Sequence, residues 1–363
     1  MTSPHDDAPA TPAAAAGPDS LDLARAVANL PEQLEAALAS SEATQGAVDG
    51  GRIANVAVMG MGGSGVAGDI VSALAAPLMP VPVTVAKDYE CPAFVGPTTL
   101  AIAVSFSGNT EETLEAATTA HDAGASVIAV TSGGRLAELA GEWAAPLYEV
   151  DSTIPMPRAA VGAISVAPLV ALERAGLLSG IAGWVDAAAA QLRRRRGAAD
   201  GASAAADSLE GIVSAVGNGE MTPVFYGGGA LGAVAAGRAK AQINENAKIP
   251  AFASFMPELC HNELAGWDQA GRLAGGSPLA VIALRHGFEH PQLGRRYDFT
   301  SGVLDGARIV VPHAELHAAG DGPMAQLFDL IYQVDVLSLR VAAAVRRDPG
   351  PIPLLEELKA FLA

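Results

Sequence analysis

A short segment rich in hydroxyl groups is the first candidate for chemistry in this chain. Ser105, Ser107 and Thr110 surround Gly108 in the sequence SFSGNT, between an apolar run and a segment with a helical pattern. Hydroxyl groups and the free N–H groups of a helix N-terminus can bind a phosphate dianion without basic side chains. A helix cap needs only one such hydroxyl, so three of them favour a phosphate site over a simple cap. The pattern GxxxxGK[ST] does not occur in the sequence, which disfavours nucleotide hydrolysis.

A glycine-rich segment, GMGGSG at residues 60–65, also follows an apolar run and precedes a helical pattern. Its glycines fit the GxGxxG pattern of dinucleotide-binding loops. The acidic residue that such sites carry about 20 residues later is poorly matched, because Lys87 precedes the candidate Asp88. The residues alone leave three interpretations open, which are a dinucleotide loop, a structural turn and a cradle for a phosphate or sugar.

Glu245 and His261 are the candidates for acid–base chemistry. Glu245 ends a helical pattern within the sequence NENAK, and His261 follows in PELCHNELAGW. A carboxylate and an imidazole that reach one pocket can act as general base and general acid near neutral pH. The spacing alone leaves open the alternative of a solvated helix end and a loop histidine.

Two pairs of histidines have the spacing of metal ligands but not the context. His286 and His290 are separated by a segment that begins with glycine and are followed by proline, which disfavours a single helix. His313 and His317 form HAELH rather than the HExxH of zinc proteases. We therefore expect no metal site.

The elements that must position these residues alternate regularly in the first half of the chain. Apolar, β-branched runs predict strands, and amphipathic segments predict the helices between them. This alternation indicates βαβ units and a parallel sheet covered by helices on both faces. The predicted strands are residues 53–60, 81–86, 99–107, 126–133 and 146–151, and the predicted helices are residues 64–76, 110–125 and 136–144.

The second half of the chain also alternates between predicted strands and predicted helices, so we predict an α/β chain with two similar halves. Its predicted strands are 222–229, 278–284 and 307–312, and its helices are 230–247 and 324–345. Residues 160–195 are predicted to be helical, and 197–205 to form a loop. The predicted division is a disordered tail (1–19), N-terminal helices (20–49), a first domain (50–165), a helical linker (166–214), a second domain (215–345) and a C-terminal segment with a short helix (346–363).

The composition excludes several classes of protein. Of 363 residues, 50% are hydrophobic and 17% charged, so the chain is too apolar to be disordered. The net charge of −17 disfavours a nucleic-acid partner, which would favour a basic surface. No apolar run reaches the about 20 residues of a membrane span, so we expect no membrane partner. With two cysteines and no targeting pattern, we expect a cytoplasmic protein.

Five segments are distinctive when they are taken together, namely GMGGSG (60–65), SFSGNTEET (105–113), MPRAAVG (156–162), INENAKIPA (243–251) and PELCHNELAGW (257–267). In this order they resemble the bifunctional phosphoglucose/phosphomannose isomerases of the sugar isomerase (SIS) superfamily. The resemblance covers about residues 50–363. It implies a homodimer of chains with two SIS domains, each a doubly wound, flavodoxin-like parallel sheet flanked by helices. It also implies isomerisation of glucose 6-phosphate and mannose 6-phosphate to fructose 6-phosphate through a cis-enediol(ate), without metal or cofactor.

The resemblance implies which residues bind the hexose 6-phosphate. One loop would contact the substrate, and the hydroxyl-rich loop would hold the phosphate. The matching positions are Gly62, Gly63 and Ser64 in the first loop and Ser105, Ser107 and Thr110 in the second.

The resemblance also implies a set of catalytic residues. Arg158 matches an arginine beside the reacting oxygens, and Glu245 matches the base that moves a proton between C1 and C2. His261 matches a ring-opening histidine that the neighbouring subunit contributes, so each active site would be shared across the dimer. Lys359, in LEELKAFL, matches a C-terminal lysine that assists at the ring. These residue types suit the reaction, because ring opening needs proton transfer and an enediolate needs a fixed cation.

Two positions depart from the family pattern. Gly350 stands where many members have Thr, whose hydroxyl is linked to the preference between mannose and glucose substrates, and Cys260 stands where Asn is usual. The alternatives to this isomerase are a non-catalytic phosphosugar-binding regulator and an isomerase of another phosphosugar. The regulator is disfavoured because Arg158, Glu245 and His261 are all retained, whereas binding alone needs only the hydroxyl loop.

Overall fold

Buried runs of small and β-branched residues form the first sheet. Every residue of β3 is buried, as expected for a strand with helices on both faces. All neighbouring strands are parallel, in the order β2-β1-β3-β4-β5. This flavodoxin-like order confirms the predicted fold class for the first half of the chain. The strands are β1 (Asn55–Met59), β2 (Val83–Ala86), β3 (Thr99–Val104), β4 (Ser126–Thr131) and β5 (Leu147–Glu149).

The computed structural model describes residues 17–197, 204–272, 279–306 and 311–362 of the chain. Within this described part, seven helices surround or extend the first sheet. Pro31 lies in the first turn of α2, where its missing N–H removes no helical hydrogen bond. It therefore starts a second N-terminal helix. The helices are α1 (Leu23–Ala28), α2 (Leu30–Glu42), α3 (Gly62–Ala75), α4 (Glu111–Asp122), α5 (Gly134–Glu142), α6 (Val161–Arg174) and α7 (Ile181–Gly197).

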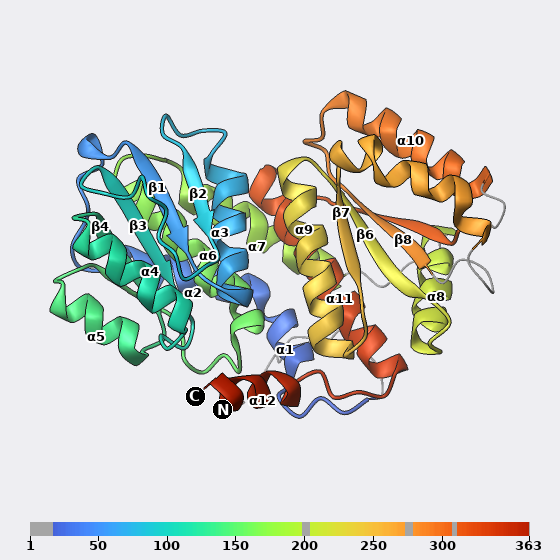
Figure 1. Cartoon of the computed structure of the whole chain (residues 1–363), viewed down its shortest axis with the longest axis horizontal. Coiled ribbons are helices and arrows are strands. Elements are labelled where there is room, and N and C mark those ends of the chain that lie inside the picture. Colours follow the sequence, from blue (N-terminus) through green and yellow to red (C-terminus); the bar gives the residue numbers. More distant parts are fainter. Residues whose placement is uncertain (1–16, 198–203, 273–278, 307–310, 363) are drawn as a thin grey trace, which may run out of the picture.

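A second parallel sheet forms a second lobe beside the first (Figure 1). Its strand order, β7-β6-β8-β9, repeats that of the first sheet without a fifth strand, so the predicted architectural repeat is confirmed. The strands are β6 (Thr222–Gly228), β7 (Phe252–Met256), β8 (Leu279–Arg285) and β9 (His313–His317). The helices are α8 (Ala204–Gly217), α9 (Gly229–Gln242), α10 (Pro291–Gly306), α11 (Pro323–Ala344) and α12 (Pro353–Leu362).

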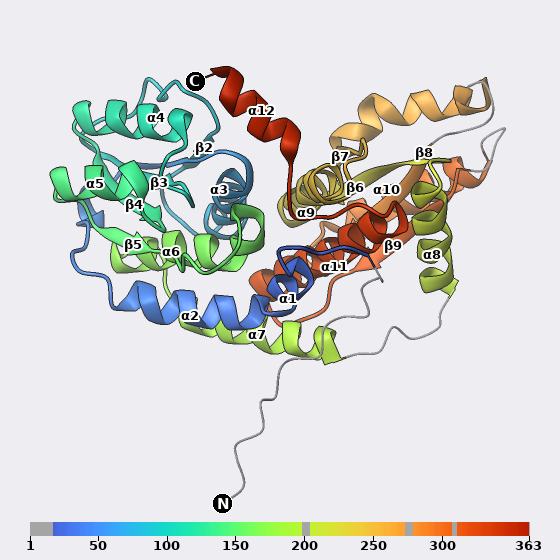
Figure 2. The same cartoon turned by 90° about the horizontal axis from the view of Figure 1, so that it is seen from below.

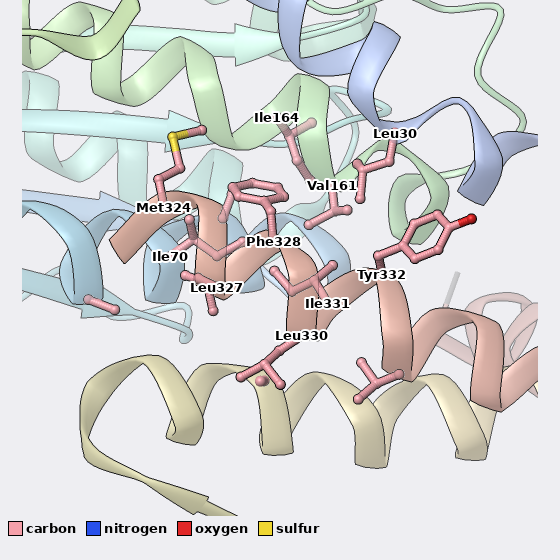
Figure 3. Close-up of a cluster of buried hydrophobic side chains, with 14 of the residues drawn as sticks. Leu30, Ile70, Val161, Ile164, Met324, Leu327, Phe328, Leu330, Ile331 and Tyr332 are labelled. Carbon is pink, nitrogen blue, oxygen red and sulfur yellow. The ribbon is translucent and has the colours of Figure 1, made fainter. Parts of the chain in front are cut away.

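The long apolar helix α11 joins the two lobes. It packs against α7 and against α9. Figure 3 shows side chains of α11 beside Ile70, Val161 and Ile164 of the first lobe, while Leu330 points toward the helix on the opposite side. The relative position of the two lobes is therefore fixed by a shared core rather than by a flexible connection.

Several second-lobe elements differ from the sequence prediction. The predicted helix 230–247 is α-helical only as far as Gln242 and continues as a π-helical turn, Ile243–Ala247. The strand predicted at 307–312 was wrong in position, because β9 lies at His313–His317; residues 307–310 are outside the described part. Helix α8 begins within the predicted 197–205 loop, of which residues 198–203 are also outside the described part.

Two further elements, β7 and α10, were not predicted. Strand β7 lies at the edge of its sheet and exposes Phe252 and Phe255. Helix α10 begins at Pro291, the residue that the sequence pattern suggested would break a helix. The first 16 residues of the predicted tail lie outside the described part, and the domain limits stay a prediction.

Candidate active site

The two candidate substrate loops meet at the carboxyl-terminal edge of the first sheet. The chain order reverses between β1 and β3, and the segments 60–64 and 105–110 follow these two strands. Open α/β sheets commonly hold their ligand in the crevice at this point. Ser64 Oγ accepts a hydrogen bond from the N–H of Phe106 at 3.1 Å, so the loops form one continuous wall.

The three hydroxyl groups of the second loop have different surroundings. Ser105 is buried, its Oγ lies 2.8 Å from Thr110 Oγ1, and it accepts the N–H of Gly108 at 3.1 Å. Ser107 is exposed, and Thr110 is partly exposed. Gly108 has a φ of +70°, and a Cβ there would lie 1.8 Å from the carbonyl oxygen of Gly133. Ser105 therefore shapes the loop, while Ser107 and Thr110 are the more accessible hydroxyls.

The helices that begin at this crevice have open N-termini. Thr110 precedes α4 and Met61 precedes α3, and neither side chain caps the N–H groups of the first turn. Those N–H groups remain available for an anion, which the helix dipole also favours. Thr110 is therefore not a simple helix cap, which was the alternative to a phosphate site.

Arg158 connects this crevice to the second lobe. It lies in the 3-10 helix Pro157–Ala160, which packs so closely on Gly63 that a Cβ there would lie 3.1 Å from Arg158 N. The buried guanidinium donates from Nε to Asn246 Oδ1 at 2.9 Å and from Nη1 to Glu245 Oε2 at 3.3 Å. Burial lowers the pKa of Arg158, and the carboxylate of Glu245 counteracts this effect. The result is a fixed cation beside the candidate base.

The π-helical turn after α9 positions Glu245. Such turns are rare in proteins and occur frequently at functional sites. Next to Glu245, the Asn246 side chain donates to Ser338 Oγ on α11 at 2.8 Å, which ties the turn to the shared core. The side chain of Glu245 is 29% exposed, compared with 8% for Arg158. The carboxylate is thus accessible to a substrate while it is paired with the arginine.

The segment between α11 and α12, residues 345–352, closes one side of this cluster, and we call this segment the crossing. Arg158 Nη2 donates to the carbonyl oxygens of Pro349 at 2.5 Å and Gly350 at 2.8 Å. Gly350 also lies against Leu21, because a Cβ on this glycine would be 2.9 Å from Leu21 Cγ. The departure from the family pattern at Gly350 therefore stands directly beside the candidate catalytic arginine.

The sequence reasoning missed Asn246 and Lys248, which belong to the same motif as Glu245. Lys248 Nζ donates to carbonyl oxygens on the crossing, those of Asp348 at 2.5 Å and Pro349 at 3.1 Å. The signal in the sequence is a cationic residue three positions after the candidate base, at the end of the motif NENAK.

His261 is not brought to Glu245 within one chain. Strand β7 runs parallel to β6, so the chain returns through α9 from the carboxyl-terminal end of β6 to the amino-terminal end of β7. Glu245 precedes β7 and His261 follows it, in the 3-10 helix Glu258–His261. The five residues of β7 extend roughly 16 Å at about 3.3 Å per residue. The two residues therefore lie toward opposite ends of the second sheet, and His261 is exposed.

A buried network supports the segment that carries His261. Tyr226 OH donates to Glu263 Oε1 at 2.5 Å, and Ser254 Oγ donates to the same carboxylate. Trp267 Nε1 donates to Tyr226 OH at 2.9 Å. Burial and the neighbouring Glu263 raise the pKa of Tyr226. These contacts with β6 and β7 hold the His261 segment against the end of the second sheet.

Lys359 lies on α12, a helix that has no buried residue. Figure 2 shows α12 extending from the second lobe toward the first, with its end beside α4. Lys359 itself is exposed, and the structure does not join it to the cluster of Arg158 and Glu245.

The corresponding position in the second sheet is filled by side chains. A Cβ on Gly228 would lie 3.0 Å from Tyr297 OH, and His286 Nε2 lies 2.9 Å from Gly228 O.

Within the described ranges, no group of three or more His, Cys, Asp and Glu side chains could hold a metal ion. Within those ranges, too, no helix is long and apolar enough to cross a membrane.

Comparison with known proteins supports the two-lobed description. Residues 53–144 match the SIS domain family, and residues 214–362 match the bacterial phospho-glucose isomerase C-terminal SIS domain. The C-terminal domain of glucosamine-fructose-6-phosphate aminotransferase from Francisella tularensis has a TM-score of 0.66 and 16% identity. The match covers 91% of this chain and 98% of that chain. At this level of identity the likeness shows a common fold.

Relatives of higher identity show the family. A D-glucosamine-6-phosphate 4-epimerase from Sulfolobus acidocaldarius is 31% identical over 58% of this chain and 62% of its own length. A bifunctional phosphoglucose/phosphomannose isomerase from Caldicellulosiruptor bescii is 32% identical over 93% of this chain and 98% of its own length. With two SIS domains and a match along almost its whole length, the chain belongs to the bifunctional phosphoglucose/phosphomannose isomerase family.

Proposed function

We propose that this protein interconverts glucose 6-phosphate and mannose 6-phosphate with fructose 6-phosphate. The observation that carries the proposal is the pairing of Arg158 with Glu245 at 3.3 Å, next to a crevice with two open helix N-termini. The crevice suits a phosphate dianion, and the pair suits the formation of an enediolate. The names of relatives such as the Caldicellulosiruptor bescii protein support the same substrates.

The proposed reaction moves one proton between two carbon atoms. His261 assists ring opening by moving a proton between O1 and O5. Glu245 then takes the proton from C2 of the aldose, and the electrons of the C–H bond form the C1–C2 double bond, leaving negative charge on O1 near Arg158. Glu245 returns its proton to C1 while the proton of O2 passes to O1, which gives the ketose. Because the enediolate is planar, reverse protonation on either face of C2 gives glucose or mannose stereochemistry.

The remaining candidate residues bind the substrate in this proposal. Ser107 and Thr110 hold the phosphate together with the N–H groups of α4, and Ser105 shapes their loop. Gly62, Gly63 and Ser64 line the other side, and Lys359 on α12 assists at the sugar ring. The accessibility of Ser107 and Thr110 and the absence of a side-chain cap on α4 in the described structure support this assignment.

We also propose a homodimer in which His261 serves the active site of the partner subunit. The separation of Glu245 and His261 along β7 supports this arrangement, because one chain does not bring the two residues together.

The cytoplasm is the proposed location, and the free thiols of Cys91 and Cys260 are consistent with a reducing compartment.

A second candidate is an enzyme that acts on another phosphosugar. The relative named D-glucosamine-6-phosphate 4-epimerase favours this candidate, although it matches a shorter part of the chain. The same phosphate crevice would then receive an amino sugar.

Coupled assays of the purified protein with each hexose 6-phosphate test the proposal. Glucose 6-phosphate and mannose 6-phosphate should both yield fructose 6-phosphate, at rates unchanged by a chelator. Glucosamine 6-phosphate in a parallel assay should give no product. Conversion of glucosamine 6-phosphate alone would favour the second candidate, and loss of activity in chelator with recovery on added zinc would contradict the metal-free mechanism.

A further inference from the structure

Lys248 ends the turn that carries Glu245 in an unusual backbone conformation. Its φ of +59° and ψ of +36° are left-handed, a conformation that glycine adopts freely and most other residues avoid. A glycine would satisfy the backbone at this position. The presence of a lysine therefore points to a use for its side chain.

The ammonium group of Lys248 is matched by three carbonyl oxygens. Nζ donates to Asn246 O at 3.2 Å, to Asp348 O at 2.5 Å and to Pro349 O at 3.1 Å. A protonated lysine has three N–H donors, so each of them has an acceptor here. Two of the three acceptors belong to the crossing that leads from α11 to α12.

Arg158 holds the same crossing from the other side. Its Nη2 donates to the carbonyl oxygens of Pro349 at 2.5 Å and Gly350 at 2.8 Å. Each of the three consecutive carbonyl groups of Asp348–Gly350 thus accepts from Lys248 or from Arg158, and Pro349 O accepts from both. We call this arrangement the crossing latch. Helix α12 itself has no buried residue.

The charges around Lys248 make the latch sensitive to protonation. The pKa of Lys248 is lowered to about 8, first by burial and then by the charges of Arg158 and Arg347, while Asp348 and Glu245 act in the opposite direction. A neutral amine has two N–H donors and a lone pair, so one of the three carbonyl oxygens would lose its donor. The charged form thus matches all three oxygens, but burying its charge costs free energy, which is relieved when the proton leaves.

We propose that Lys248 is a positioning residue, which holds the crossing with Arg158 and thereby keeps Arg158 aligned on Glu245 and α12 beside the first lobe. The effect on catalysis rests on the proposed isomerase function, whereas the effect on α12 does not. Lys248 acts through Arg158 and the crossing rather than on the substrate.

Lys248→Gly tests the proposal, because glycine suits the left-handed backbone while the ammonium group is lost. Hydrogen exchange of α12 amides should become about tenfold faster in this variant, since the helix is less firmly held. The kcat of isomerisation should fall about 10- to 100-fold, with a smaller change in KM, because Arg158 is misplaced. Lys240→Met, which removes an exposed lysine from α9, should change none of these quantities.

Each result decides a different part of the proposal. Unchanged exchange of α12 in folded Lys248→Gly would overturn the latch, whatever the enzyme does. Faster exchange with unchanged kcat would overturn the positioning role. An inactive wild-type protein would contradict the proposed function, and the exchange experiment would still decide the latch. Lys248→Asn, whose short side chain also tolerates the left-handed conformation, replaces the glycine variant if that variant does not fold.

Discussion

Arg158 Nη1 and Glu245 Oε2 lie 3.3 Å apart, although 87 residues separate them in the chain. Arg158 follows the last strand of the first sheet, and Glu245 follows α9 in the second lobe. The pair therefore depends on the relative position of the lobes, which the core around α11 fixes. A cation and a base that are held in place before the substrate arrives need little reorganisation during the reaction.

Replacement of Ser107 and Thr110 by Ala tests the phosphate crevice. The two hydroxyls would be lost while the N–H groups of α4 remain, so KM for hexose 6-phosphates should rise more than kcat falls. Steady-state kinetics on both sugars measures this effect. Thr119→Ala removes an exposed hydroxyl farther along the same helix and should leave KM unchanged. An unchanged KM in the double variant would show that the phosphate binds elsewhere.

Because Gly350 lies against Leu21, substitutions at these two positions should have coupled effects on the stability of the protein. Gly350→Thr places a Cβ 2.9 Å from Leu21 Cγ, so the exposed Leu21 side chain must shift, and the variant should lose about 1 kcal/mol of stability or less. Leu21→Ala makes room, so the double variant should be more stable than the sum of the single effects by about 0.5 kcal/mol or more. Urea unfolding of the four proteins measures this coupling. Strictly additive effects would contradict the close packing.

The pKa of Lys248 predicts a pH dependence of stability. Burial lowers it to about 8 in the folded protein, against 10.5 for an ordinary lysine. Between these two values the unfolded chain holds the proton and the folded chain does not, so this group makes the free energy of unfolding rise with pH. Below the lower value its full burial penalty is present. From about pH 7.5 to about pH 9.5, the wild type should therefore gain stability relative to Lys248→Gly. A constant difference in urea unfolding would argue against the buried ammonium.

Mixed dimers test the proposed sharing of active sites. Glu245→Gln and His261→Ala, each inactive, are unfolded and refolded together in equal amounts. Random pairing makes about half of the dimers mixed, each with one intact site, so about a quarter of the wild-type activity should return.

A matched control follows from the contact between Arg158 and Glu245 in one chain. Glu245→Gln mixed with Arg158→Ala should regain nothing, because each site then carries one defect. If the first mixture stays as inactive as its parents despite confirmed mixed dimers, each site takes both residues from one chain.

The first sheet was predictable because local signals agree there. Its strands are continuous apolar runs, and the glycine and hydroxyl residues that follow β1 and β3 mark the crevice. The pairing of Arg158 with Glu245 had no such signal, since it depends on how two lobes pack. Spacing left the role of Glu245 open, and only the family resemblance connected it to Arg158.

The missed elements have local reasons. Strand β7 is an edge strand with exposed phenylalanines, so its pattern lacks a continuous apolar run. Pro291 suggested a break, but a proline in the first turn of a helix removes no helical hydrogen bond. The π-helical turn at Ile243–Ala247 interrupts the helical period just where Glu245 stands. The role of Lys248 depends on a crossing about 100 residues later, a separation that no local pattern reveals.

Proton transfer in deuterium oxide tests the central claim most directly. Fructose 6-phosphate is incubated with the protein, and the products are followed by NMR. Both glucose 6-phosphate and mannose 6-phosphate should form and acquire deuterium at C2, because the protonated base exchanges with solvent. Glu245→Gln should slow this exchange by about 10²- to 10⁴-fold, while Glu115→Gln, an exposed change on α4, should not. Exchange at a near-normal rate in folded Glu245→Gln, or no exchange in the wild type, would contradict the account.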